Sequence, residues 1–380
     1  MVGEAMDEID TGLEGVVVGA TKISHVEGVV GRLSYRGHDI ATLCQRPFPQ
    51  VIWLLLFGEL PSAQQEQQLA HFLLAHAALG DSDRQLLGAV PEGTHPMLML
   101  QGLVPLLSLE QRESLELPTR SEDAVHGLII AARLPALIAS YFRREQGLDW
   151  PLHSHSIEPH RLFLKTLHDR NPSAEQVAVL DTTQILQMEH SYNAGTFAGR
   201  VTLSTQAPVQ ASISASLGTL FGKLHGGADQ AALETAMRVA EPEQAADYVR
   251  KCLREGGRIM GMGHREYRTV DPRASLLKPL ARQLCKDPDS ARLLATLEAI
   301  EAACVEQLEK PGRSIRANVE FYKGAVFHAL GIPPRYFTAL FAMARVYGYI
   351  AHALEFRPQS RLIRPRARYT GRQPKDHQAA

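Results

Sequence analysis

A histidine beside two glycines is the feature of this chain best suited to chemistry. His225 precedes Gly226 and Gly227, and residues 228–237 have the composition of a helix. Backbone can approach closely at glycine because it has no Cβ, and the free N–H groups at a helix N-terminus disfavour a positive charge on a nearby histidine. A neutral histidine held in this way can lend a proton to an oxyanion and take it back. A turn that merely carries a histidine into a helix would show the same pattern.

A second histidine and a carboxylate extend this chemistry. His264 follows two glycines and stands among three arginines in residues 260–274, Met-Gly-Met-Gly-His-Arg-Glu-Tyr-Arg-Thr-Val-Asp-Pro-Arg-Ala. Residues 317–324, Ala-Asn-Val-Glu-Phe-Tyr-Lys-Gly, supply Glu320. Two histidines and one carboxylate suffice to abstract a proton next to one carbonyl and to protonate a second carbonyl.

These stretches resemble the site motifs of the citrate synthase family. Residues 224–230 are similar to the end of the family's GPLHGGANE, residues 263–274 to GHRVYKxxDPRA, and residues 318–324 to NVDFYSG. Further motifs follow in the family's order at residues 33–40 (LxYRGYDI), 189–205 (D/E-HxxNASTFxARVxxST), 341–355 (FxxxRxxGWxAHxxE) and 362–371 (IRPRxxYxG). The resemblance covers about residues 13–371, nearly the whole chain.

The elements that must position these residues are mostly helical. Apolar residues recur with the i, i+3, i+4 spacing of helices in twelve segments: residues 50–57, 64–78, 97–108, 125–142, 175–190, 208–222, 228–240, 243–254, 274–285, 289–308, 320–330 and 334–355. Residues 13–40 instead contain five glycines and short β-like runs, which predict a small sheet or an extended arm. The sequence therefore predicts an all-α protein with a minor β element near the N-terminus.

The resemblance also implies an architecture and partners. It implies a citrate synthase-like fold of two helical domains, a large one of residues 1–226 together with 332–380 and a small one of residues 227–331. The implied assembly is a homodimer with a shared active site between the domains. The implied partners are oxaloacetate and acyl-CoA, and since acyl-CoA is a substrate, no cofactor is expected.

Roles for single residues follow from the same resemblance. Glu320 would deprotonate the acetyl-CoA methyl group, His225 would stabilise the enol, and His264 would polarise and protonate the oxaloacetate carbonyl. Arginine suits bidentate carboxylate binding. The implied oxaloacetate ligands are His190, Asn193, Arg273, Arg345 and, from the neighbouring subunit, Arg364; the implied CoA ligands are Arg268 and Arg366. His190 and Asn193 are three residues apart and are predicted to share a helix face.

Composition argues against several other classes of protein. The 380 residues are 45% hydrophobic and 21% charged with a net charge of −1, so nucleic acid is not an expected partner. Four scattered cysteines and an acidic N-terminus without an apolar core predict reduced thiols, no signal peptide and a cytoplasmic location. Arg133 and Pro135 interrupt the apolar segment 125–142, which predicts a buried helix and no membrane span. No metal site is expected at the histidines that no cysteine or well-spaced carboxylate joins: His153, His155, His160 and His168.

Several residues depart from the family motifs, and some of these lie beside the chemistry. Glu320 stands where the motif has aspartate. The other departures are Lys223 for proline, Asp229-Gln230 for Asn-Glu, Gly195 for serine and Tyr349 for tryptophan.

Three functions therefore stay open. One is condensation of acetyl-CoA with oxaloacetate to citrate, and another is the same chemistry on propionyl-CoA, which gives 2-methylcitrate. Glu189-His190 and residues 94–97 resemble the 2-methylcitrate branch. The third is a weakly active or non-catalytic relative that binds a metabolite or partner, for which the arginine-rich segment 357–372 offers a patch for polyanions.

Overall fold

The computed structural model describes residues 12–13, 15–118, 121–149, 158–308 and 315–372, and its chain begins with a small antiparallel sheet. The strands are β1 (Ser24–Glu27), β2 (Arg32–Tyr35) and β3 (His38–Asp39). Ser24 pairs with Tyr35, and Tyr35 also pairs with His38. Leu33 and Tyr35 alternate onto the buried face, as the period of a strand requires. The predicted minor β element is confirmed.

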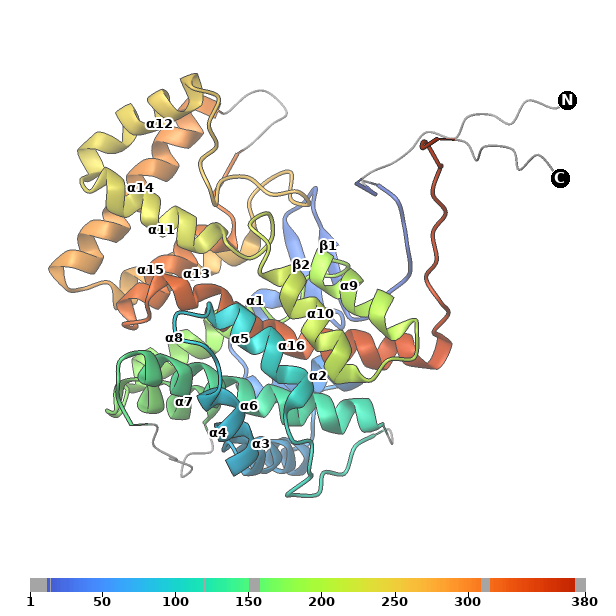
Figure 1. Cartoon of the computed structure of the whole chain (residues 1–380). Helices are drawn as coiled ribbons and strands as arrows, with labels where there is room; N and C mark the ends of the chain where they lie inside the picture. The colour runs from blue at the N-terminus through green and yellow to red at the C-terminus, as the bar shows by residue number, and fades with distance from the viewer. Residues whose placement is uncertain (1–11, 14, 119–120, 150–157, 309–314, 373–380) are drawn as a thin grey trace, which may run out of the picture.

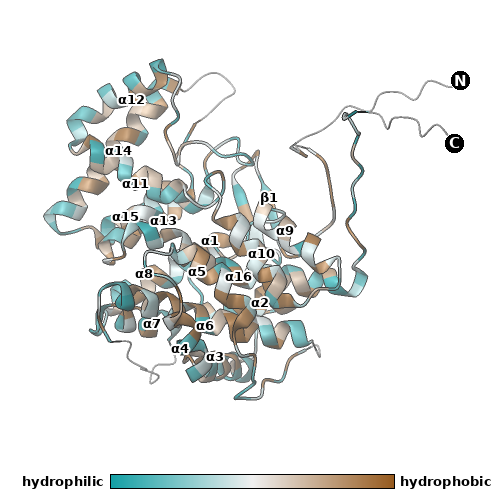
Figure 2. Ribbon diagram, in the orientation of Figure 1, coloured by the Kyte–Doolittle hydropathy of each residue, from teal (hydrophilic) through white to brown (hydrophobic). Residues whose placement is uncertain are grey.

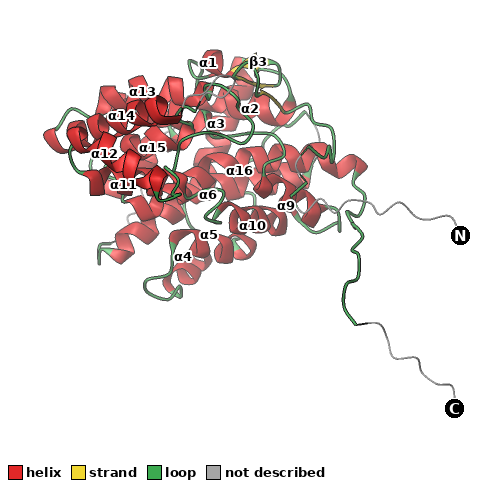
Figure 3. Cartoon of the chain, turned by 90° about the horizontal axis from the view of Figure 1, so that it is seen from above, coloured by secondary structure: helices red, strands yellow, loops and turns green. Residues whose placement is uncertain are grey.

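Helices form the other regular elements of the described residues (Figure 3). The first half holds α1 (Ile40–Leu43), α2 (Phe48–Phe57), α3 (Ala63–Ala77), α4 (Asp81–Gly88), α5 (Pro96–Leu103), η1 (Val104–Leu106), α6 (Glu122–Glu145), α7 (Pro159–His168) and α8 (Ala174–Ile185). The second half holds α9 (Ala194–Leu203), α10 (Val209–Leu220), α11 (Ala228–Val239), η2 (Pro242–Gln244), α12 (Ala245–Arg254), α13 (Pro272–Leu284), α14 (Pro288–Leu308), α15 (Val319–Ala329), η3 (Pro334–Tyr336), α16 (Phe337–Phe356) and η4 (Arg357–Gln359). The all-α class is confirmed, and each of the twelve predicted segments contains a helix.

Two predicted helices end early. The helix predicted over residues 175–190 ends at Ile185, and the one predicted over 97–108 ends at Leu103 and continues as the 3₁₀ turn η1. Residues 186–190 are buried although they form no helix, so their apolar pattern looks like that of a buried helix.

The core lies along α16. Residues 337–353 of this helix are all buried, and the helix packs against α2, α6, α9 and α10. Figure 2 shows the apolar ribbon concentrated on these central helices. A Cβ at Gly127 of α6 would lie 2.7 Å from Ile350 Cγ1, so the glycine lets α6 approach α16 closely.

The apolar helix α6 packs inside the molecule. Among the described residues it is the one helix long and apolar enough to cross a membrane, yet 72% of its most apolar window is buried. Its Arg133 is fully buried and forms an ion pair of 3.3 Å with Asp83. The predicted buried helix is confirmed.

Helices α11 to α15 pack on one another at one end of the molecule, and the chain then returns to the centre as α16 (Figure 1). This group coincides with the predicted small domain of residues 227–331, and the division into two domains stays a prediction. At the other end, the segments 15–22 and 360–372 run as extended chain on one side of the helical body (Figure 1).

Candidate active site

The three predicted catalytic residues lie at the starts of helices or in the loops before them. His225 lies in the turn between α10 and α11, as predicted, and His264 lies in the loop between α12 and α13. Glu320 is in the first turn of α15 and is 7% exposed. Helix starts offer free N–H groups, so they suit sites that handle negative charge.

Asn318 ties the His264 loop to the start of α15. Its Oδ1 accepts a hydrogen bond from the backbone N–H of Glu320 at 2.9 Å, which caps the helix, and its Nδ2 donates to the carbonyl of Gly263 at 2.8 Å. Gly261 has a φ of 80°, and a Cβ there would lie 2.9 Å from the ring of Phe321. Only glycine fits this position, so the glycines of the loop allow its close approach to α15.

Asp271 joins the starts of α13 and α15 and was not among the predicted site residues. It caps α13, and its two oxygens accept from Arg273 Nε at 3.0 Å, Arg273 Nη2 at 2.9 Å and the backbone N–H of Val319 at 3.0 Å. Both side chains are buried, and the arginine holds the pKa of Asp271 below its usual range against the effect of burial. The Asp-Pro pair, a helix cap followed by a proline at the first helical position, is the sequence signal that marks it.

The hydrogen bonds of His264 define which nitrogen offers a proton. Its Nδ1 accepts from the backbone N–H groups of Glu266 at 3.0 Å and Tyr267 at 3.2 Å. The neutral ring therefore carries its proton on Nε2, which lies 3.3 Å from Arg273 Nη2. Burial and the charge of Arg273 lower the pKa of His264 to about 4. In this tautomer both nitrogens are donors, and an acceptor oxygen bound beside them would satisfy both.

His190 lies beside His264 in a cationic corner formed by the charges of Arg273 and Arg345. Its ring centroid lies 5.3 Å from that of His264, and its Nε2 contacts the hydroxyl of Tyr267 at 3.2 Å. Burial, followed by the charges of Arg273 and other cations, lowers its pKa well below the ordinary value. The charge of Arg345 on α16 also lowers the pKa of His190. Arg345 is held by a 2.7 Å hydrogen bond from its Nε to the carbonyl of Gln187.

The predicted helix face shared by His190 and Asn193 is wrong. Both residues lie in the loop between α8 and α9, because α8 ends at Ile185 and Asn193 caps α9. Asn193 Oδ1 accepts from the backbone N–H of Thr196 at 3.1 Å and lies 3.2 Å from His225 Nε2. Burial and the charge of Arg345 lower the pKa of His225 to about 4, so the ring is neutral near pH 7 and its Nε2 donates to the amide oxygen.

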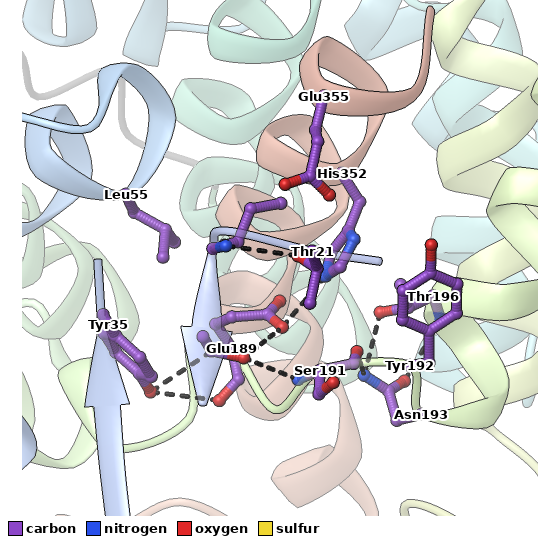
Figure 4. A network of polar contacts seen from close by, with 12 residues as sticks. Thr21, Tyr35, Leu55, Glu189, Ser191, Tyr192, Asn193, Thr196, His352 and Glu355 are labelled. Atoms are coloured by element: carbon purple, nitrogen blue, oxygen red, sulfur yellow. Dashed lines mark hydrogen bonds and ion pairs between the residues drawn. The ribbon is translucent and has the colours of Figure 1, made fainter. Parts of the chain in front are cut away.

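A buried polar network holds the loop that carries His190 (Figure 4). Glu189 is fully buried and accepts hydrogen bonds from His352 Nε2 of α16 at 2.9 Å and Ser24 Oγ of β1 at 3.1 Å. The hydroxyl of Tyr35 in β2 donates to the Glu189 carbonyl at 3.1 Å. Burial raises the pKa of Glu189, but His352 and the other partners outweigh it and hold the pKa below its usual range. The N-terminal sheet thus positions the loop.

Glu320 does not stand alone, because Lys323 lies one helical turn away. Lys323 Nζ donates to Glu320 Oε2 at 2.7 Å and lies 3.1 Å from Asp229 Oδ2 of α11. Lys323 and Asp229 are fully buried. Burial raises the pKa of Glu320 above its ordinary value, although Lys323 opposes the shift. Sequence analysis missed Lys323, which stands where the family motif has serine.

Phe341 of α16 links the two parts of the site. Lys323 Nζ lies 4.2 Å from its ring centroid and the guanidinium carbon of Arg345 lies 4.6 Å from it. The ring of His225 packs edge-on against it at 6.4 Å. The predicted residues His190, His225, His264, Arg273, Arg345 and Glu320 are thus brought together with Asn193.

The other predicted ligands lie outside this cluster. Arg268, Arg364 and Arg366 are exposed. The backbone N–H of Arg268 donates to the carbonyl of Gly28 at the tip of the β1–β2 hairpin, and Arg364 lies on the extended C-terminal segment. Their roles toward CoA and toward a neighbouring subunit stay predictions.

The described residues contain no group of three or more histidines, cysteines or carboxylates placed to hold a metal ion. Of the four histidines considered for a metal, His160 contacts Asp181, and His168 Nε2 contacts the carbonyl of Leu330 at 2.8 Å. His153 and His155 lie outside the described residues.

A mostly helical protein that gathers arginines, neutral histidines and a buried carboxylate has the groups needed for acid–base chemistry on an anionic substrate. The family model described as "Citrate synthase, C-terminal domain" matches residues 12–366. This chain belongs to the citrate synthase family of acyltransferases.

Curated relatives include synthases of two kinds. The 2-methylcitrate synthase of Shewanella oneidensis is 34% identical over 370 residues, which is 96% of this chain and 95% of the relative. The citrate synthase of Synechocystis is 34% identical over 362 residues, which is 95% of this chain and 90% of the relative.

Solved structures agree on the fold. The ternary complex of citrate synthase from Thermoplasma acidophilum with carboxymethyl coenzyme A and oxaloacetate has a TM-score of 0.89 and 28% identity, over 97% of this chain and 98% of that one. The citrate synthase of Thermotoga maritima has a TM-score of 0.85 and 29% identity, with the same coverage.

Proposed function

We propose that this member of the family condenses acetyl-CoA with oxaloacetate to give citrate and free CoA. The observation that carries the proposal is the pair of donors His264 Nε2 and Arg273 Nη2, 3.3 Å apart in a buried corner that also holds His190. A small dianion that presents a carbonyl and carboxylates to such a corner satisfies both donors. Arg345 supplies further positive potential, and the neutral His190 offers a ring nitrogen for hydrogen bonding.

The chemistry then divides between the two sides of the site. Glu320 takes a proton from the methyl group of the thioester, and His225 turns the N–H that it gives to Asn193 in the free protein toward the enol oxygen. The enol carbon attacks the carbonyl carbon of oxaloacetate, and His264 gives its Nε2 proton to the new alkoxide. Water then adds its hydroxyl to the acyl carbon and returns a proton to His264, and the CoA thiolate leaves with the proton that Glu320 holds.

Condensation of propionyl-CoA to 2-methylcitrate is the second candidate. The observation that favours it is the 34% identity to a 2-methylcitrate synthase, which equals the identity to a citrate synthase. Both reactions use the same proton transfers and differ by one methyl group on the reacting carbon. The shape of the acyl pocket therefore decides between them.

Release of free thiol separates these functions. We expect thiol release with oxaloacetate and acetyl-CoA to have a higher kcat/KM than release with propionyl-CoA, measured side by side. Faster turnover of propionyl-CoA would transfer the assignment to 2-methylcitrate. Absence of thiol release with both donors would refute condensation and favour a non-catalytic relative.

We also propose that the protein forms a homodimer in which Arg364 enters the partner's site. The C-terminal segment is extended and exposed, and Leu362 and Tyr369 on it are 62% and 70% exposed. Apolar side chains on an extended segment suit burial against a second copy. Together with the position of Arg364 in the matched motif, these features support an exchanged segment.

Mixed dimers test this assignment. Chains with Arg364→Ala and chains with Glu320→Ala are each expected to be inactive. If sites are shared, a mixed dimer has one site with both defects and one with neither, so activity returns. Proven exchange of subunits without recovered activity would refute the shared site.

A further inference from the structure

Lys323 is a fully buried lysine beside the proposed base, and its burial calls for a physical explanation. Its side chain is fully buried on α15, and the free energy of burying an ammonium group is unfavourable unless anions accept its hydrogen bonds. Two carboxylates lie against it: Glu320 Oε2 on the same helix accepts a hydrogen bond at 2.7 Å, and Asp229 Oδ2 on α11 forms an ion pair at 3.1 Å. The ring of Phe341 on α16 covers the third side at 4.2 Å.

Other charged groups face this trio from the helices around it. The charge of Arg273 on α13 lowers the pKa of Glu320. Arg345 of α16 lies over the same Phe341 ring as Lys323. Glu301 of α14 is engaged elsewhere, since it accepts from the hydroxyl of Tyr322 and from Lys278. Within the described residues, the carboxylates that form ion pairs with Lys323 are thus Glu320 and Asp229.

The three positions differ from the family motifs as a set. The motifs have aspartate, serine and asparagine at positions 320, 323 and 229, which carry one negative charge in total. Here glutamate, lysine and aspartate carry two negative charges and one positive charge, so the total is again one negative charge. Asp229 without Lys323 would be a buried carboxylate without a cation, and Lys323 without both carboxylates would be a poorly paired ammonium group.

We propose that Lys323 is a positioning residue for the base, and that the buried trio Glu320–Lys323–Asp229 replaces the single aspartate of the family motifs. The proposal rests on the proposed function, in which Glu320 is the base. Glutamate is longer than aspartate by one methylene, about 1.5 Å. The 2.7 Å contact with Lys323, one turn along the same helix, fixes where the longer side chain places its carboxylate.

Asp229 has its own part in this arrangement. When Glu320 takes the substrate proton it becomes neutral, and its ion pair with Lys323 is lost. Asp229 then keeps the buried ammonium group paired, so proton transfer leaves no isolated buried charge. Both partners also influence the ionisation of Glu320: burial raises its pKa, Lys323 lowers it, and Asp229 raises it.

These opposite influences give the test. Lys323→Met removes the cation, so the acid limb of the kcat–pH profile should move to higher pH, and kcat at pH 7 should fall about tenfold or more. Asp229→Asn removes the second carboxylate, so the acid limb should move to lower pH. Lys323→Arg keeps the charge and should stay near the wild-type limb. The KM for oxaloacetate should change less than about twofold in all three variants, because the cationic corner is untouched.

A reversion experiment guards against simple misfolding. Lys323→Ser alone should lose activity, and adding Glu320→Asp and Asp229→Asn to it should recover most of the loss, because the set then matches the family motifs. If Lys323 had only a structural role, the acid limbs of Lys323→Met and Asp229→Asn would not move in opposite directions. The triple variant would then be no more active than Lys323→Ser alone. Either result overturns the proposal.

An infrared titration makes the outcome independent of turnover. The carboxyl band that disappears in Glu320→Gln reports the ionisation of Glu320, and it should titrate at higher pH in Lys323→Met and at lower pH in Asp229→Asn. A wild-type protein without thiol release would refute the proposed function alone. Unchanged infrared titrations in both variants would refute the role of Lys323, whether or not the protein turns over.

Discussion

The two halves of the candidate site are built in different ways. In the anion-binding half, the groups that would face oxaloacetate are anchored to backbone: His264 by two N–H groups, Arg345 by a carbonyl, and Arg273 through the helix cap Asp271. In the proton-abstracting half, Glu320 is anchored by a side chain, Lys323, that is itself held by another side chain. The first half keeps the residues of the family motifs, and the second half departs from them.

The difference shows what each task requires. A dianion is recognised by several donors in fixed directions, and moving one of them weakens the others. A base needs one carboxylate at one place in one ionisation state, and different sets of side chains can supply that if their total charge is kept. The proton-abstracting half can therefore change as a set, whereas the anion-binding half cannot.

Replacing the base should give the largest loss of turnover, and the effect should be confined to the proton-abstracting half of the site. Glu320→Gln cannot accept a proton, so kcat should fall by about 10²–10⁴-fold. Oxaloacetate should bind as in the wild type, measured by calorimetry. Unchanged turnover in this variant would show that Glu320 is not the base.

Glu320→Asp, which restores the residue of the motif, should also lower turnover. The shorter carboxylate is drawn away from the contact that Lys323 makes, and a displacement near 1 Å can reduce the rate about a hundredfold. A severalfold rise with acetyl-CoA would instead mean that the glutamate is a poor fit and that the two halves differ less than the contacts suggest.

Removing an arginine should affect mainly the other half. Arg273→Ala leaves Asp271 buried without its partner and removes a carboxylate ligand, a loss of about 2–5 kcal/mol in oxaloacetate binding. The readout is the KM for oxaloacetate compared with that for acyl-CoA. Arg282→Ala is the matched control, because Arg282 pairs with Glu298 on the surface, where ion pairs contribute little to stability. Equal effects on both substrates would contradict a divided site.

Most helices with an apolar stripe were predicted from the sequence, but α1, α4, α7 and α9 fall outside the predicted segments, and α9 shows one reason. Its residues Ala194–Leu203 include two glycines, and it packs against α10 through small side chains. A Cβ at Gly199 would lie 2.5 Å from Ser216 Oγ, so close approach takes the place of apolar bulk. Hydrophobic periodicity does not detect such packing.

The candidate site shows the same limit. Its histidines and arginines could be identified because each stands in a recognisable local motif. The side chains that position Glu320 could not be identified, since Asp229 and Lys323 meet only when α11 packs against α15. Asp271 was within a quoted motif, but its bond to Val319 joins two helix starts that are far apart in sequence.

The neutral histidines should make stability depend on pH. The pKa of His225 and of His264 is about 4 in the folded protein and near 6.5 when unfolded. The unfolded chain therefore binds more protons between these values, and stability should fall as pH drops from about 6.5 toward 4. Melting temperatures between pH 7 and 4.5 test this, since Asp271 and Glu189, with lowered pKa values, stay ionised in that range. Between pH 7 and 4.5 the melting temperature of His264→Gln should fall less than that of the wild type. Parallel curves of melting temperature against pH would contradict the lowered pKa of His264.

The smallest expected effect concerns Gly195 and Tyr349, two further departures that lie in contact. A Cβ at Gly195 would lie 2.5 Å from the hydroxyl oxygen of Tyr349 and 3.2 Å from its ring carbon Cζ. That hydroxyl is buried and has no hydrogen-bond partner among the residues that the structure describes. Removing a buried hydroxyl without a partner is nearly neutral or stabilising, so Tyr349→Phe should leave the free energy of unfolding almost unchanged or raise it.

Gly195→Ala tests whether these two departures changed as a pair, as the trio did. In the wild-type background the added methyl group forces the tyrosine aside, and overpacking of this kind destabilises by about 1–3 kcal/mol. In the Tyr349→Phe background the closest contact is gone and the 3.2 Å contacts with Cζ and with the backbone oxygen of Ser216 stay, so the destabilisation should be smaller. Urea unfolding of the four proteins gives the coupling energy, expected at about 1 kcal/mol. Equal destabilisation in both backgrounds would mean that Gly195 and Tyr349 changed independently, and that linked replacement is special to the buried charges around Glu320.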